Sequence, residues 1–475
     1  MILEDCLQAR KLLGGSRNDE FKKKLPPCQG VFKIKVSAEP RVWAYQSSLL
    51  KYGPFIKHIK NPQELFHGWK FDSVMPSEHE LLSHFVKHCV NIQELTLDIC
   101  HQSDESHRII KGIAGYLAPH LRGLSMRCWF SYKSGSELYL HIISRCSPKL
   151  EKLEIYDRSR PVLFGDVNLK ESEKGAISDI ALSGLKELVL DQSYSTGDLS
   201  SWDCFWKSCG NVERLELRSW RHEMTDYMVS RIRDYLPKLK SIVLEDMPRQ
   251  AILPLLSDCR ESLKYIQTDV PLTQDSSAAM AKHCPSLEEL HVTRICRDSS
   301  KTLHYILLSS PKLRVLVTSH DDLSWRFRGF IPFIVAKDFI DEDPHLGSLN
   351  SWACEQSLRV LKTKIVGIPR PDVPRYQRRH RSSHVEAPAC EGKRLQHRVY
   401  ERLSRFTNLE ELCLGHNALT SDHTTHSSDG EEEDSDFQYE CLDMTLESGL
   451  DQLKKLKNLK VLDVQWMEQR IGVKE

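Results

Sequence analysis

Cysteine is the residue type whose placement in this sequence most directly suggests chemistry. Five of the 15 cysteines lie three or four residues before a recurring apolar position: Cys89, Cys146, Cys209, Cys259 and Cys284. Thiolates bind zinc, and protein zinc sites usually draw their ligands from CxxC pairs or Cys–His clusters. Neither spacing occurs here. We therefore interpret these cysteines as small buried thiols that pack tight turns, and the sequence predicts no metal site and no cofactor.

Motifs for other chemistry are also missing from the sequence. It contains no phosphate-binding GxxxxGK[ST] loop, no GxGxxG turn, no HExxH helix and no GxSxG elbow. The carboxylate runs DEDPH (341–345) and EEED (431–434) lie in polar stretches. Acid–base catalysis needs carboxylates that are desolvated and rigidly held. We therefore expect no catalytic residues and no enzymatic activity.

The charge balance limits the classes of partner. The chain has 475 residues, with 66 Lys+Arg and 66 Asp+Glu, so no overall field favours nucleic acid or a membrane surface. The N-terminus lacks a basic segment followed by an apolar stretch, and no run of about 18 apolar residues occurs. We expect a cytoplasmic or nuclear protein with reduced cysteines, and neither a membrane nor nucleic acid as its partner.

A short apolar pattern, first seen as NIQELTL at 91–97, recurs along the chain. Twelve copies are present, and their second apolar position falls at Leu95, Leu124, Leu153, Leu188, Leu215, Ile242, Ile266, Leu290, Leu316, Leu361, Leu412 and Leu462. Most neighbouring copies are 24 to 29 residues apart, and the last three steps are 45, 51 and 50. A fixed period of this size is typical of a repeat architecture.

Each repeat unit is expected to contain one strand and one helix. In most copies the last two apolar residues are two apart, so they point to one face of a short strand. Between copies, apolar residues recur at helical spacings of three and four, as at Ile110, Ile113 and Leu117. One such unit cannot bury its apolar face alone, whereas stacked units form a continuous core.

The repeated L-x-x-L-x-L pattern resembles that of the leucine-rich-repeat family, over roughly residues 80–466. The resemblance implies an α/β solenoid with a curved parallel sheet on the concave side and helices on the convex side. It also implies Cys or Asn at the turns into the strands.

Several segments resemble a narrower family, the F-box/leucine-rich-repeat (F-box-like) proteins of fungi. LLKYGPFIKHI (49–59) is similar to the strand that follows the F-box, and 357–373, 395–416 and 440–473 look like C-terminal blocks of these proteins. The resemblance implies the substrate-recognition part of an SCF-type E3 ubiquitin ligase, bound to a Skp-type adaptor and a cullin if an F-box is supplied. The F-box itself is not evident in residues 1–29.

These patterns predict the following organisation. Residues 1–60 form an N-terminal cap that corresponds to the segment after an F-box, and leucine-rich repeats occupy 61–368, 399–419 and 441–475. Two polar insertions are expected to be disordered: a basic one (369–398) and an acidic one (420–440). The basic insertion is interpreted as a solvated loop or a nuclear-localisation patch, and the acidic insertion as a spacer or a phosphorylated motif.

A partner protein is expected on the concave face, through strand residues that the core leaves free. The candidates are Thr96, Asp98, Arg127, Trp129, Glu154, Tyr156, Asp191, Glu216, Arg218, Trp220, Glu245, Asp269 and His291. The acidic residues among them suggest that a basic segment of the target docks there. Two alternatives stay open: a free-standing scaffold without a ubiquitin role, and a clamp that regulates an enzyme.

Overall fold

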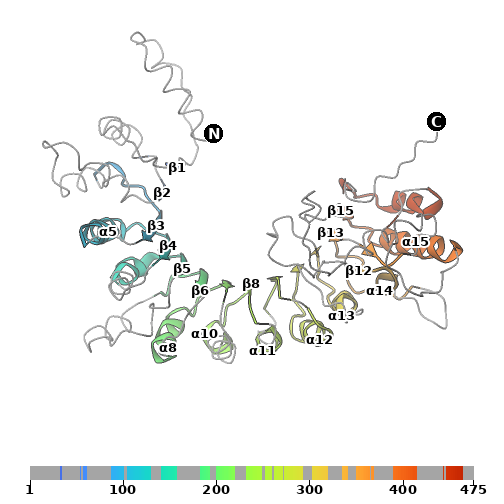
Figure 1. Cartoon of the computed structure of the whole chain (residues 1–475), viewed down its shortest axis with the longest axis horizontal. Coiled ribbons are helices and arrows are strands. Elements are labelled where there is room, and N and C mark those ends of the chain that lie inside the picture. The colour runs from blue at the N-terminus through green and yellow to red at the C-terminus, as the bar shows by residue number, and fades with distance from the viewer. Residues whose placement is uncertain are drawn as a thin grey trace, which may run out of the picture. The chain divides into compact units, whose positions relative to one another are not determined.

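The computed structural model describes the greater part of the repeat region (Figure 1). The described residues are 33–34, 54, 57–60, 87–100, 104–129, 141–157, 182–192, 199–219, 232–248, 252–258, 262–270, 272–292, 302–318, 334–340, 349–363, 365–368, 389–414, 442 and 446–463. The chain forms two compact units, one of residues 1–227 and 234–238 and the other of residues 228–233 and 239–475.

The first unit contains a parallel ladder of strands in chain order. Its strands are β1 (Lys33–Ile34), β2 (His58–Lys60), β3 (Glu94–Cys100), β4 (Gly123–Trp129), β5 (Lys152–Asp157), β6 (Glu187–Gln192) and β7 (Arg214–Arg218). Helices α5 (Asp104–Leu117) and α8 (Leu199–Ser208) and the 3₁₀ turn η3 (Ser147–Lys149) connect them. The helices lie along one side of the ladder (Figure 1).

The second unit repeats this arrangement. Its parallel ladder contains β8 (Ser241–Glu245), β9 (Tyr265–Thr268), β10 (Glu289–Val292), β11 (Val315–Val317), β13 (Val360–Thr363), β15 (Glu411–Leu414) and β16 (Val461–Asp463). A second small sheet pairs β12 (Ile334–Val335) with β14 (Ile365–Val366). The helices are α11 (Ile252–Asp258), α12 (Gln274–His283), α13 (Thr302–Ser309), α14 (Ala336–Ile340) and α15 (Ala389–Ser404), with turns η7 (Leu446–Ser448) and η8 (Leu450–Lys455). Helix α10 (Ile232–Tyr235) contains the boundary between the units.

The twelve predicted motif copies all lie in strands of these ladders, which confirms the α/β leucine-rich-repeat solenoid. The second apolar residues pair with one another in register, as in Leu95 with Leu124 and Leu361 with Leu412. From β3 to β15 this position is at most 1% exposed, whereas Leu462 in β16 is 45% exposed. The core of the second unit is therefore open to solvent at its last described strand.

Polar side chains hold successive turns together just before the strands. Asn91 donates from its side-chain amide to the carbonyl of Pro54 (2.6 Å), and Asn211 donates to that of Ser183 (2.6 Å). Ser262 does the same through its hydroxyl to Leu239 (2.9 Å). These bonds satisfy backbone carbonyls of the preceding repeat that the strands do not use.

The ladder extends beyond the region predicted as repeats. Strand β2 lies inside the predicted N-terminal cap, and its Ile59 pairs with Leu95 and is 1% exposed. Helix α15 begins at Ala389, inside the range predicted as a basic disordered insertion. Gln396, Val399, Tyr400 and Leu403 are buried at helical spacing, which explains why this end of the range is helical. Residues 369–388 and 420–440 lie outside the described residues.

Candidate protein-interaction face

The side chains that alternate with the core leucines lie on the side of the first unit's ladder away from its helices. We call this side the open face, and it corresponds to the predicted concave face. Register places its residues in three rows across β3 to β7: Glu94, Gly123, Lys152, Glu187 and Arg214; Thr96, Ser125, Glu154, Val189 and Glu216; and Asp98, Arg127, Tyr156, Asp191 and Arg218.

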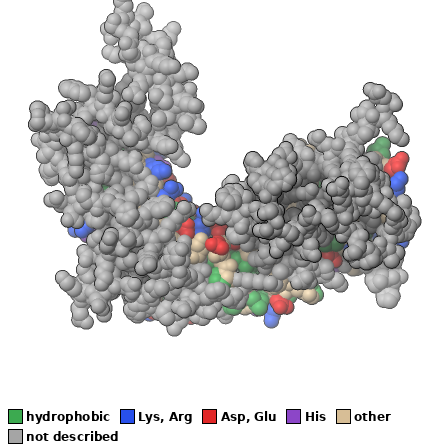
Figure 2. Space-filling model, viewed as in Figure 1, with side chains coloured by type: hydrophobic (Ala, Val, Ile, Leu, Met, Phe, Trp, Pro, Cys, Tyr) green, Lys and Arg blue, Asp and Glu red, His purple; other side chains and the backbone are tan. Residues whose placement is uncertain are grey.

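Two of the predicted acidic residues of this face, Glu154 and Glu216, form ion pairs with basic residues. Nζ of Lys152 lies 2.9 Å from Oε1 of Glu154 and 3.4 Å from Oε1 of Glu187. The buried Glu216 lies between two arginines, with Nη2 of Arg214 at 3.7 Å and Arg218 in direct contact. Figure 2 shows basic and acidic side chains next to each other among the described residues. The face is therefore a network of mixed charge rather than an acidic stripe.

The ionisation of Glu154 follows from its neighbours. Burial alone raises the pKa of this carboxyl, but hydrogen bonds from Lys152 and Ser125 outweigh burial and lower the pKa below its ordinary value. For Lys152, burial lowers the pKa, and the hydrogen bond and charge of Glu154 outweigh that effect and raise it. Both groups are charged at neutral pH, so the pair is a true ion pair.

Tyr156 is the aromatic side chain on this face whose surroundings are described. Its hydroxyl donates to Oε2 of Glu154 at 3.5 Å, and the Arg127 guanidinium carbon lies 5.5 Å from its ring centroid. Burial, followed by the charge of Glu154, raises its pKa to about 12. Tyr156 therefore presents a neutral, hydrogen-bonded ring beneath an exposed arginine.

The remaining candidates do not form one group. In the second unit, Oδ1 of Asp269 accepts the backbone N–H of Asp246 (2.8 Å), a residue with φ of 53° at the end of β8, so Asp269 supports a turn. His291 packs 5.2 Å from the Tyr265 ring, and Glu245 is half-buried. The side chains of Asp98 and Trp129 and the whole of Trp220 lie outside the described residues, while Thr96 and Asp191 are largely buried.

The predicted burial of the cysteines is confirmed at four of the five positions: Cys89, Cys146, Cys209 and Cys284. Cys259 lies outside the described residues. Burial raises the pKa of each of the four thiols to about 12. Within the described part of the chain, no cluster of three or more His, Cys, Asp and Glu side chains is placed to hold a metal ion. The thiols are therefore protonated packing groups.

This shift predicts a loss of stability in alkali. An unfolded thiol loses its proton near pH 9, whereas Cys209 in the folded chain keeps its proton up to about pH 12. Between these values the unfolded state binds fewer protons, so each such thiol lowers the free energy of unfolding by about 1.4 kcal/mol per pH unit. Urea denaturation between pH 9 and 10.5 should show a shallower decline for Cys209→Ala than for the unmodified chain. Equal slopes would contradict this assignment.

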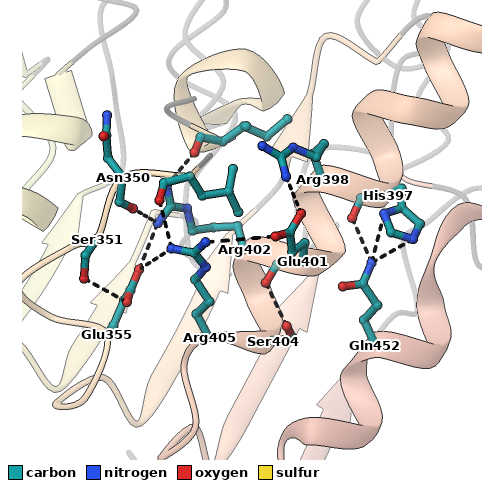
Figure 3. A network of polar contacts seen from close by, with 12 residues as sticks. Asn350, Ser351, Glu355, His397, Arg398, Glu401, Arg402, Ser404, Arg405 and Gln452 are labelled. Atoms are coloured by element: carbon teal, nitrogen blue, oxygen red, sulfur yellow. Dashed lines mark hydrogen bonds and ion pairs between the residues drawn. The ribbon is translucent and has the colours of Figure 1, made fainter. Parts of the chain in front are cut away.

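One polar network in the second unit was not predicted from the sequence (Figure 3). Arg402 of α15 is fully buried and donates from Nη1 to Oε1 of Glu355 (2.9 Å) and from Nη2 to the carbonyl of Ile340 (2.5 Å). Its guanidinium carbon lies 4.2 Å from the Trp352 ring centroid, and it also donates to the carbonyl of Asn350. The network joins α15 to Ile340, Asn350, Trp352 and Glu355, and we assign it a structural role.

None of the helices in the described residues is long and apolar enough to cross a bilayer. No protein-family model matches the sequence, and neither does any curated protein. Among solved structures, the chain is similar to the leucine-rich repeat-containing protein LegL7 from Legionella pneumophila, with 11% identity and a TM-score of 0.40, over 62% of this chain and 94% of that one. It is also similar to a chain of the Rad7 and Elc1 complex in yeast, with 12% identity and a TM-score of 0.31. This similarity covers 60% of the present chain and 80% of the yeast chain.

Proposed function

We propose that this chain is a non-catalytic scaffold that holds a target protein on the open face. The observation that carries the proposal is the open face itself. Five adjacent strands present Arg127, Lys152, Tyr156 and their register partners away from the helices, in a chemically varied surface on which these three side chains are exposed or half-buried. Such surfaces on repeat arrays are suited to protein contacts. In this role the chain needs no reactive group of its own.

The finer form of the proposal is substrate recognition for an SCF-type E3 ubiquitin ligase. Its support is the resemblance of residues 49–59 and of three C-terminal segments to fungal F-box-like proteins. In that assembly a Skp-type adaptor and a cullin join through an F-box, and the target protein occupies the open face. The proposed site of action is the cytoplasm or nucleus.

Affinity capture with the tagged full chain tests the scaffold proposal. Tyr156→Ala is expected to reduce recovery of the target about tenfold, because aromatic residues at the centre of an interface carry a large share of binding energy. Tyr116→Ala is the matched control, because Tyr116 is exposed on α5, on the helix side of the same unit. Recovery that falls equally in both variants, or in neither, would contradict the assignment of the open face.

The same capture tests the ligase assignment independently. Recovery of a Skp-type adaptor and a cullin, unchanged in Tyr156→Ala, is the expected result. If target proteins are recovered without these two components, the chain is a scaffold outside the ubiquitin system. In that case the ligase assignment fails while the scaffold proposal stands.

A further inference from the structure

The charged side chains of the open face differ in depth. Across β5 to β7 the cationic side chains of Lys152, Arg214 and Arg218 are 36 to 41% exposed. The acidic side chains of Glu154, Glu187 and Glu216 are only 8 to 31% exposed. On β4, Arg127 is exposed as well. A partner that approaches this part of the face therefore meets ammonium and guanidinium groups before it meets carboxylates.

Ion pairs keep the cationic side chains near the surface of the open face and the acidic side chains below them. Glu187 forms ion pairs with both Lys152 (3.4 Å) and Arg214 (3.5 Å), and Glu216 is buried beneath Arg214 and Arg218. A basic partner would have to displace these cations to reach the carboxylates, which leaves the displaced cations without their counter-charges. The negative charges of an anionic partner can instead contact the cations while these stay paired with the carboxylates beneath them. The cationic side chains are already ordered by those ion pairs, which reduces the entropic cost of binding.

We infer that the open face of β4 to β7 binds an extended acidic segment of the target protein, an inference that rests on the proposed scaffold function. Arginine is suited to this because its planar guanidinium pairs with carboxylates through two parallel hydrogen bonds. The acidic stripe expected from the sequence predicted a basic segment instead, and the difference in depth between the two signs reverses that expectation.

The spacing of the cations defines the segment further. Arg127 on β4 and Arg218 on β7 belong to the same row and are three strand positions apart. With strands about 4.8 Å apart, this corresponds to about 14 Å across the face. Residues i and i+4 of an extended peptide are also about 14 Å apart and point to the same side. The segment that the face fits therefore carries Asp or Glu at positions i and i+4.

The test uses the full chain and fluorescein-labelled peptides in a Gly/Ser background, followed by fluorescence anisotropy. The acidic peptide has Glu at positions i and i+4, and the comparison peptide has Lys at the same positions. We expect the acidic peptide to bind and the lysine peptide not to bind. Added salt should weaken binding of the acidic peptide, because the contacts are between charges.

Two sets of variants place the contact on the face. Arg127→Glu with Arg218→Glu is expected to weaken binding about tenfold or more. The control is Arg122→Glu with Lys186→Glu, because both residues are more than 60% exposed and pair with Glu151 just before the strands, outside the open face. Circular dichroism checks that each variant is folded. If the loss of Arg218, which contacts Glu216, disturbs folding, the single variant Arg127→Glu is used instead.

Three results would overturn the inference: stronger binding of the lysine peptide, equal losses in the face and control variants, or equal competition by a single-stranded DNA of the same charge. The outcome is separable from that of the scaffold proposal. If Tyr156→Ala releases the target but the charge variants keep it, the face binds a target of other chemistry, and only the acidic-segment inference fails.

Discussion

Replacement of Arg402 by alanine is expected to lower the free energy of unfolding of the second unit by about 3–5 kcal/mol. The guanidinium is fully buried and joins Glu355, the carbonyl of Ile340 and the ring of Trp352. Its removal takes the closest counter-charge from the largely buried Glu355 carboxylate, which keeps hydrogen bonds from Ser351 and the Trp352 N–H, and it takes a donor from the Ile340 carbonyl. Taking a partner from such buried groups costs more than the net value of the original bonds.

Urea denaturation followed by circular dichroism measures this loss. Arg394→Ala is the matched control, because Arg394 lies on the same helix and is exposed; it should change the free energy of unfolding by less than about 0.5 kcal/mol. The double variant Arg402→Met with Glu355→Leu should recover much of the stability, because it removes both charges together. If Arg402→Ala is as stable as Arg394→Ala, the polar network around Arg402 contributes little to the free energy of unfolding.

The second large effect concerns one motif position in two environments. Leu188→Ala in β6 is expected to cost about 2–5 kcal/mol, because Leu188 is fully buried and its removal leaves a cavity in the core. Leu462→Ala in β16 occupies the equivalent motif position but starts from a side chain that is 45% exposed. It should cost less than about 1 kcal/mol. Thermal and urea denaturation of both variants compare the two costs, and equal losses would contradict an open end at β16.

The fold could be predicted from the sequence because its signal is local and repeated. Nine of the twelve motif copies contain two apolar residues two apart at their end, and this alternation assigns Leu95 and Leu97 to the core and Thr96 to the opposite face. In the other three copies the last core position is a buried threonine: Thr268, Thr318 and Thr363. Twelve repetitions then exclude an accidental match. The same alternation, extended one step toward the N-terminus, would also have placed Lys152 and Arg214 on the open face beside Glu154 and Glu216.

The depth of each charge could not be predicted in this way. Glu216 is buried because arginines from its own strand cover it, and that arrangement depends on side-chain conformations rather than on position in the motif. Arg402 is a stronger case. Its partners Asn350 and Ile340 are 52 and 62 residues away in the chain, so no short-range pattern marks it as buried.

The strands keep their one-to-one register although the connections between them differ widely in length. Neighbouring motif copies are separated by as few as 24 residues and as many as 51, yet Leu316, Leu361 and Leu412 remain direct partners. The described parts of the long connections, such as α14 and α15, lie outside the ladder, and the strand register is unchanged. A chain built in this way can gain or lose loop segments through small genetic insertions and deletions without refolding its core. New contacts can therefore evolve at the connections while the open face keeps its arrangement.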